Sequence, residues 1–242
     1  MSRSKVNKDL FRSIWMQLAT VTCWLLWSGY SEDHQKANVG EIRGKITVAS
    51  KDDEIEGMLR GRDLSRYDRY SHSLSKPTEP YRISEKAVVY IDSVQGDGLA
   101  KPPDVHPQLI QRDLLFRPLV LPVIVGTTVD FPNKDDLFHN VFSYSGPKEF
   151  DLGRYPKGQK KSVTFDTPGI VSVYCDIHSY MSATILVLGH PFFASPDDDG
   201  DYSISRVPPG KYKLSFWYGR KKVETRKITV RAGETTTMNF EY

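Results

Sequence analysis

The chain contains few cysteines and no repeated segment, and both absences narrow the class of protein. Only 2 of its 242 residues are cysteine, which excludes a disulfide scaffold and a cysteine-rich zinc module. No period of about 20 to 50 residues recurs, which excludes solenoids and propellers. The formal net charge is +3, too small to make a nucleic acid the expected partner. With 39% hydrophobic and 12% aromatic residues, the composition is that of an ordinary folded protein.

Long apolar runs are also missing, except for one near the start. Residues 13–30 carry no charge and follow a head with four basic residues, a pattern typical of a secretory signal. Small residues around Ser31 predict cleavage there, so residues 1–31 are expected to be a signal peptide. An uncleaved membrane anchor is the alternative, but the run is short for a full span and contains Gln17. We therefore expect a periplasmic or secreted protein.

Removal of this segment changes the charge and cysteine balance. The segment contains four basic residues and one acidic residue. Its removal therefore reduces the 33 basic and 30 acidic residues of the whole chain to 29 of each. The remaining chain is neutral, keeps Cys175 alone, and has no internal disulfide even in an oxidising compartment. No second apolar stretch is long enough for a span, so no stable membrane insertion is expected after cleavage.

The rest of the chain is predicted to be all-β. Short runs of β-branched residues alternate with turns at Gly and Pro, and no helical period is present between 107 and 188. This spacing is typical of a β-sandwich, and a second, smaller β unit follows it. Strands are expected at 108–111, 119–125, 127–131, 140–144, 162–165, 171–175 and 183–188, then at 202–205, 212–217 and 227–230.

A polar insertion, 51–86, separates two further expected strands, 44–49 and 87–91. It is rich in charge, Tyr and Ser, and prolines interrupt it near its end, although a brief helix near 54–65 fits the pattern. Its arginines alternate with tyrosines, as in segments that contact nucleic acids or anionic polymers. Acidic residues offset much of that charge, so a solvated insertion is the favoured interpretation.

The most informative segment is the heptapeptide CDIHSYM, residues 175–181. Alternation in the preceding strand places Val171, Val173 and Cys175 on one face, the expected core face. A thiolate at the end of that strand, the imidazole of His178 and the thioether of Met181 follow at three-residue intervals. A tight loop would bring the three side chains around one point.

These ligand types favour copper over other metals. Soft sulfur ligands with imidazole select copper, and a trigonal His₂Cys set with a weak axial Met forms a blue-copper electron-transfer site. The second imidazole comes from His139, which lies at the start of an expected strand. Zinc is disfavoured because a thioether is a poor zinc ligand. The competing interpretation is that these Cys and His residues only pack in the core.

Several segments together resemble the cupredoxins, in particular amicyanin, pseudoazurin and the plastocyanin-like proteins of methylamine utilisation. The resemblance spans roughly 105–190 and implies an eight-stranded Greek-key sandwich. It implies one type 1 copper ion with His139, Cys175 and His178 as equatorial ligands and Met181 as the axial ligand. It also implies that the backbone N–H of Asn140 bonds the Cys175 sulfur. The segments that carry it are TVDFPN (128–133), HNVF (139–142), TF (164–165), PG (168–169) and YCDIHSYM (174–181).

Two positions depart from the cupredoxin pattern. Ile177 stands where many small members have proline, and it keeps an N–H. A second amide bond to the thiolate would stabilise Cu(I) over Cu(II) and raise the potential. Ser179 replaces the proline that often follows the second histidine.

The end of the chain resembles carboxypeptidase regulatory-like (transthyretin-like) domains. The similarity lies in 200–214 and 230–233, and strands like 40–48 and 86–91 belong to the same pattern. Because too few residues follow position 196 for a sandwich of their own, we expect a discontinuous domain, 38–94 plus 192–242, with a cupredoxin domain at 95–191 inserted. The acidic run 197–201 lacks the later Glu of a calcium loop and fits a hairpin turn better.

These features predict an exported type 1 (blue) copper protein that carries one electron and meets a redox partner protein transiently. The alternative is a copper-binding interaction, sensing or storage module without a carrier role. Copper oxidases and reductases need further histidines, typically His-x-His pairs, and the sequence has no such pair. An enzyme is therefore not expected, and no catalytic residue is assigned.

Overall fold

The computed structural model describes residues 38–48, 81–94 and 101–242. Its named elements there are strands apart from one four-residue helix, α3 (Ile83–Lys86), so the all-β prediction is confirmed. The predicted signal peptide, the predicted helix at 54–65 and most of the polar insertion lie outside these residues. Among the described residues, no helix has both the length and the apolar character needed to cross a bilayer.

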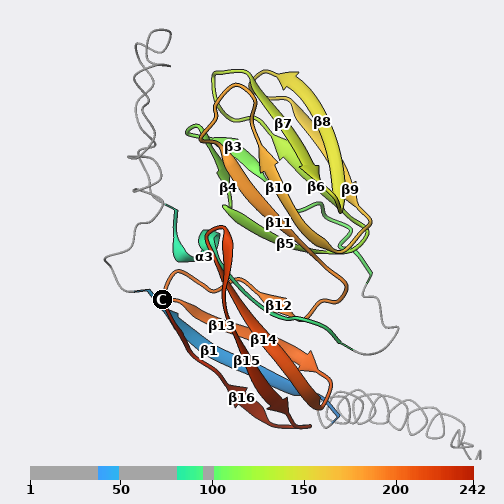
Figure 1. Cartoon of the computed structure of the whole chain (residues 1–242), viewed down its shortest axis with the longest axis vertical. Helices are drawn as coiled ribbons and strands as arrows, with labels where there is room; N and C mark the ends of the chain where they lie inside the picture. The colour runs from blue at the N-terminus through green and yellow to red at the C-terminus, as the bar shows by residue number, and fades with distance from the viewer. Residues whose placement is uncertain (1–37, 49–80, 95–100) are drawn as a thin grey trace, which may run out of the picture.

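The middle of the chain folds as one sandwich, drawn in green to orange in Figure 1. One layer is a five-stranded sheet in the order β5-β11-β10-β7-β8. The opposite layer consists of the pairs β3–β4 and β6–β9, joined by isolated bridges at Gln108–Asp130 and Gln111–Asn133. The strands are β3 (Ile110–Arg112), β4 (Leu115–Arg117), β5 (Val120–Ile124), β6 (Thr127–Pro132), β7 (His139–Ser145), β8 (Lys148–Tyr155), β9 (Lys160–Phe165), β10 (Gly169–Tyr174) and β11 (Ser182–Leu188).

Alternation along β10 sets which side chains enter this core. Val171 and Val173 are fully buried, while Ile170 and Tyr174 are 51% and 42% exposed on the other face of the sheet. Cys175 continues the buried series at 4% exposure. The predicted core face of this strand is confirmed, and it carries the thiol into the interior.

Strands β4 and β8 were not expected from the sequence. β8 is an edge strand in which Phe150 and Leu152 pack toward the core between charged neighbours, and the buried Tyr155 ends the strand. β4 begins directly after a two-residue turn at Asp113 and Leu114 that lacks glycine. Both strands therefore lack the long apolar alternation and the turn residues by which strands are recognised.

Residues on both sides of the first sandwich build a second one. β1 pairs antiparallel with β13 and parallel with β16 and β17, and β2 lies between β12 and β14. Ile42, Ile91, Leu214 and Phe240 are fully buried in its common core. The strands are β1 (Gly40–Thr47), β2 (Ala87–Ile91), β12 (Phe193–Ala194), β13 (Asp201–Val207), β14 (Gly210–Tyr218), β15 (Lys221–Val230), β16 (Thr235–Thr237) and β17 (Phe240–Glu241).

The two sandwiches pack against each other through an apolar junction. Val88, Tyr90 and Trp217 of the second sandwich form one buried cluster with Val120 and Leu186 of the first. This contact covers the outer face of β5 and β11, and α3 lies beside it (Figure 1).

The association of β1 with the end of the chain can be tested at Gly44. A Cβ atom there would overlap the backbone carbonyl of Met238 and lie 2.9 Å from the Tyr202 hydroxyl. We expect Gly44→Ala to lower the free energy of unfolding by about 1–3 kcal/mol, measured by chemical denaturation. Gly146→Ala is the control, because a Cβ atom at Gly146 meets nothing within 4 Å. Equal stabilities of the two variants would contradict this packing.

Candidate metal centre

Two neighbouring strands deliver the central donor atoms. His139 is the first residue of β7, and Cys175 follows Tyr174, the last residue of β10. These strands are antiparallel partners, with Tyr174 paired to Phe142. The start of β7 and the end of β10 therefore meet at one end of the sheet, which places the His139 and Cys175 side chains together inside the sandwich.

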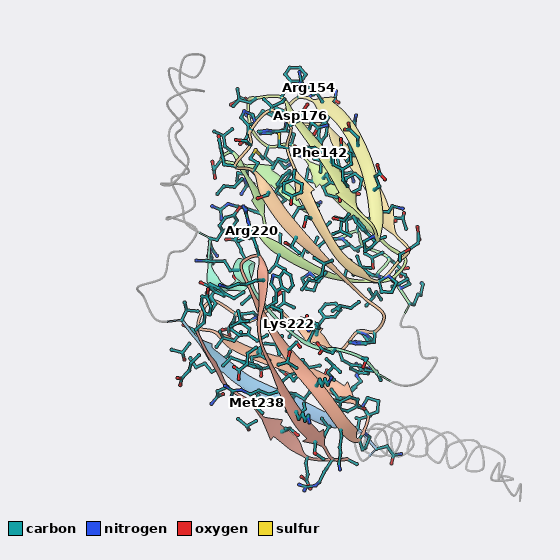
Figure 2. All side chains as sticks on the ribbon, viewed as in Figure 1. Phe142, Arg154, Asp176, Arg220, Lys222 and Met238 are labelled. Carbon is teal, nitrogen blue, oxygen red and sulfur yellow. The ribbon has the colours of Figure 1, made fainter. Side chains whose placement is uncertain are left out.

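The loop from Cys175 to Met181 is closed by its own backbone. The N–H of Cys175 donates to the carbonyl of Met181 (3.2 Å), and the N–H of Met181 donates to the carbonyl of His178 (2.9 Å). Met181 is fully buried in the same core as Cys175. Asp176 on this loop forms a 3.0 Å ion pair with Arg154 of β8, at the end of the first sandwich far from the second (Figure 2).

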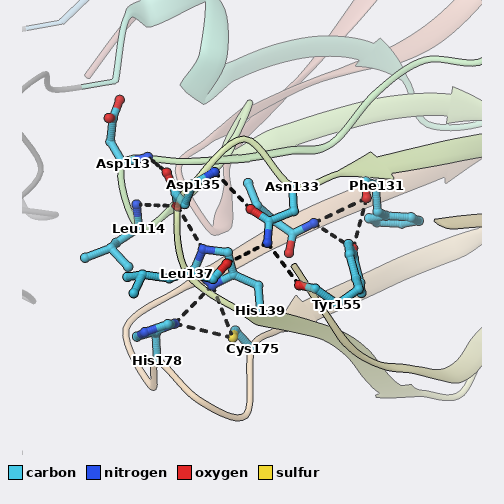
Figure 3. A network of polar contacts seen from close by, with 11 residues as sticks. Asp113, Leu114, Phe131, Asn133, Asp135, Leu137, His139, Tyr155, Cys175 and His178 are labelled. Carbon is cyan, nitrogen blue, oxygen red and sulfur yellow. Dashed lines mark hydrogen bonds and ion pairs between the residues drawn. The ribbon is translucent and has the colours of Figure 1, made fainter. Parts of the chain in front are cut away.

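Three donor atoms converge in the arrangement drawn in Figure 3. The Nδ1 atoms of His139 and His178 are 3.0 Å apart, and the Cys175 Sγ lies 4.0 Å from the first and 3.8 Å from the second. Within this triangle one point lies about 2.1 Å from all three atoms, an ordinary metal–ligand bond length. A single ion therefore fits among the donors in a trigonal arrangement.

The surroundings of Cys175 favour the thiolate form of its side chain. Burial acts to raise the pKa of Cys175, but hydrogen bonds from the His139 and His178 imidazoles and from the backbone N–H groups of Asn140 and His178 lower that pKa to about 6. The thiolate is the form that binds metals. The predicted contact of the Asn140 amide with the sulfur is among these bonds.

Asp135 contacts the opposite side of the His139 ring. Its carboxylate lies 2.8 Å from Nε2, while Nδ1 faces Cys175 and His178. Burial acts to lower the pKa of His139, but the hydrogen bonds with Asp135 and Cys175 outweigh it and raise that pKa. With its Nε2 proton donated to Asp135, the ring presents the Nδ1 lone pair to a metal, the arrangement of a carboxylate–histidine–metal triad.

The Asp135 carboxylate is itself held by backbone amides. The N–H groups of Asp113 and Leu114 donate to its two oxygens at 2.7 and 3.0 Å, and its own N–H donates to the Asn133 side chain at 2.9 Å (Figure 3). Burial acts to raise the pKa of Asp135, but the bonds from His139 and from both amides lower it overall. The carboxylate is thus fixed in its ionised form.

The structure brings together most of the residues expected at the site. His139 is fully buried, and His178 is 9% exposed. Ile177 packs against the core, but the second backbone amide that lowers the Cys175 pKa belongs to His178. The expected effect of the Ile177 amide on the potential therefore stays a prediction.

Sequence reasoning missed Asp135 and the Asp113–Leu114 turn. Asp135 precedes His139 by four residues, but that spacing indicates contact only in a helix, and these residues are not helical. The turn is distant in the sequence and lacks the glycine or asparagine typical of such turns. No local pattern in the sequence therefore indicates either feature.

Comparison with known protein sequences gave one partial match. Residues 182–238 match the family model "Polysaccharide lyase family 4, domain II", and no curated protein sequence matches the chain. That segment runs from β11 of the first sandwich to β16 of the second. The resemblance of the second sandwich to carboxypeptidase regulatory-like domains stays a prediction, because the matching model describes a different domain.

Similar solved structures include copper proteins. The Cu-containing nitrite reductase of Thermus scotoductus is 29% identical over 40% of this chain and 25% of that protein, with a TM-score of 0.34. The purple cupredoxin of Nitrosopumilus maritimus is 26% identical over 34% of this chain and 99% of its own length (TM-score 0.32). A reduced amicyanin mutant is 27% identical over 43% and 99% (TM-score 0.33). This chain is thus similar to cupredoxins over part of its length.

The pKa of Cys175 gives the first prediction for this site. In the metal-free protein, the ultraviolet absorbance of the thiolate should titrate near pH 6 instead of near 9, with Cys175→Ser as the blank. Between these values the unfolded thiol keeps a proton that the folded protein has lost, so the free energy of unfolding should rise with pH across this window. A flat profile relative to the Cys175→Ser variant would contradict the lowered pKa.

The second prediction for this site concerns the hydrogen bond between Asp135 and His139. Asp135→Asn removes the charge that holds the imidazole and should weaken metal affinity about 10–100-fold, measured by competition with a chelator. Asp136→Asn is the matched control, because Asp136 is the next residue, its side chain is 85% exposed, and its carboxylate forms a surface ion pair with Lys157. Equal affinities of the two variants would show that the carboxylate does not support the ligand.

Proposed function

We propose that this chain is an exported protein that binds one copper ion and transfers single electrons. His139, Cys175 and His178 would be the equatorial ligands, and Met181 the axial ligand. The observation that carries the proposal is the convergence of one thiol and two imidazole nitrogens around one point. Among divalent metals in proteins, a trigonal set of this composition is typical of blue copper.

The protein supplies a set of ligands that is preformed and buried. His139, Cys175 and Met181 are buried in the core of the first sandwich, and the ligand loop is closed by backbone hydrogen bonds. A copper ion bound there supplies one-electron chemistry by alternating between two oxidation states. The rigid surroundings limit how far the ligand side chains move when the charge of the site changes, which favours fast electron transfer.

His178 would be the point of electron exchange. Of the three converging residues it is the most exposed, at 9%, against 0% for His139 and 4% for Cys175. Its neighbours Ser179 and Tyr180 are exposed and partly buried, respectively, so they border the same surface. A redox protein that docks transiently on this end would approach the imidazole edge of His178, and such encounters need only a small contact area.

Export is inferred from residues 1–31 alone. The basic head and the apolar run support a cleaved signal, which would place the protein in a periplasmic or extracellular compartment. An oxidising compartment is compatible with a lone Cys175 because metal ligation protects the thiol from pairing with another thiol.

Copper titration of the purified protein tests the proposal directly. We expect one equivalent of Cu(II) to produce an intense thiolate-to-copper charge-transfer colour. In the full-length chain, which still carries residues 1–31, Cys175→Ser should abolish the colour, whereas Cys23→Ser, which removes the other cysteine, should leave it unchanged. An uncoloured wild-type protein would overturn the assignment.

Electrochemistry separates the carrier from its alternative. Reversible one-electron reduction, with the colour lost and fully regained, supports a carrier. Bound copper that cannot be cycled would instead support an interaction, sensing or storage module. Preferential binding of zinc over copper in a competition titration would argue against both.

A further inference from the structure

The turn between β3 and β4 has an unusual backbone. Asp113 and Leu114 are its two central residues, and their φ angles are +55° and +58°. Two positive φ values define a type I′ turn, for which Asn-Gly and Asp-Gly are preferred because a side chain crowds the backbone in this conformation. A leucine in the second position is a conformational outlier that the surrounding structure has to impose.

Burial explains the side chain of Leu114 but not its backbone conformation. The side chain is 6% exposed and belongs to the core of the first sandwich. A type II′ turn would connect the same two strands and would give Leu114 an ordinary negative φ, provided that residue 113 accepts a positive one. The two turns differ in the direction of the Leu114 N–H, which in the observed turn points at the Asp135 carboxylate, 3.0 Å away.

The same hairpin is anchored at its other end to the second sandwich. The Tyr81 hydroxyl donates to the backbone carbonyl of Phe116 (2.9 Å), and Arg117 forms a 2.8 Å ion pair with Glu85 of α3. The Arg117 guanidinium also lies over the Tyr81 ring, 5.0 Å from its centre. These contacts hold β4 in place, so the turn presents its amides from a fixed support.

We propose that the Asp113–Leu114 turn is a positioning element of the metal centre, whose left-handed backbone aims two N–H donors at Asp135 and thereby sets how strongly that carboxylate accepts the Nε2 proton of His139. Each amide competes with the imidazole for the carboxylate. Loss of the Leu114 amide makes Asp135 a stronger acceptor toward His139, which makes the ring a stronger donor to a metal ion. A stronger donor favours the more highly charged oxidation state and lowers the reduction potential.

A matched pair of substitutions at the exposed residue Asp113 tests this role. Asp113→Gly permits the type II′ turn and lets Leu114 relax, so the Leu114 N–H turns away from Asp135. Asp113→Asn removes the same charge but keeps a residue that tolerates the left-handed conformation. We expect the copper-loaded Asp113→Gly protein to have a lower midpoint potential than the copper-loaded Asp113→Asn protein, which carries the same change of charge.

Nuclear magnetic resonance of the Leu114 amide reports which turn forms. The Asp113→Gly protein could keep the type I′ turn. In that case the Leu114 amide is replaced by an ester, which removes the N–H in either turn, and the midpoint potential of the copper-loaded ester protein tests the proposal. A lower potential in whichever protein lacks the donor supports the proposal, and an unchanged potential overturns it.

The proposal rests on the proposed copper function, and a metal-free measurement keeps the two separate. In the metal-free protein, the NMR chemical shifts of the His139 ring nitrogens should change when the Leu114 donor is lost, because the hydrogen bond from Nε2–H to Asp135 changes strength. Failure of the wild type to bind copper would overturn the proposed function, and the His139 resonances would still decide the role of the turn. Unchanged resonances in the ester protein would overturn that role.

Discussion

The hydrogen bond between the Asp135 carboxylate and Nε2 of His139 is the interaction on which the geometry of the site depends. The ring is fully buried, so both of its nitrogens need polar partners inside the protein. Asp135 satisfies Nε2, which leaves Nδ1 facing the Cys175 thiol and the second imidazole. A different orientation of the ring would leave a buried polar atom without a partner and would break the convergence of donors.

This hydrogen bond is held from two directions. The β3–β4 turn fixes the carboxylate through two backbone amides, and the pairing of β7 with β10 fixes the ring relative to the thiol. Both supports are made of backbone hydrogen bonds, which are directional and hard to displace in a dry interior. The donor set can therefore exist before any ion arrives, and binding would require little rearrangement.

The second sandwich contributes from a distance. It covers the outer face of β5 and β11 and anchors β4 through Tyr81 and α3, while Asp176 of the ligand loop lies at the far end of the first sandwich (Figure 2). Stabilisation of the scaffold and access to the site are thus separated in space. The redox partner proposed above would therefore approach His178 without contacting the second sandwich.

The sequence alone determined the all-β class, the core-facing series that ends at Cys175, and the side chains that would act as metal donors. Each of these follows from local chemistry, since alternation fixes the faces of a strand and ligand softness favours copper. Only the tertiary structure placed Asp135 on His139, because the loop spacing between them carries no contact rule. It alone set the partners and the register with which β1 and β2 pair to strands more than a hundred residues later, and it imposed a left-handed backbone on Leu114. Those features arise from long-range pairing and from hydrogen-bond direction, which short sequence patterns do not encode.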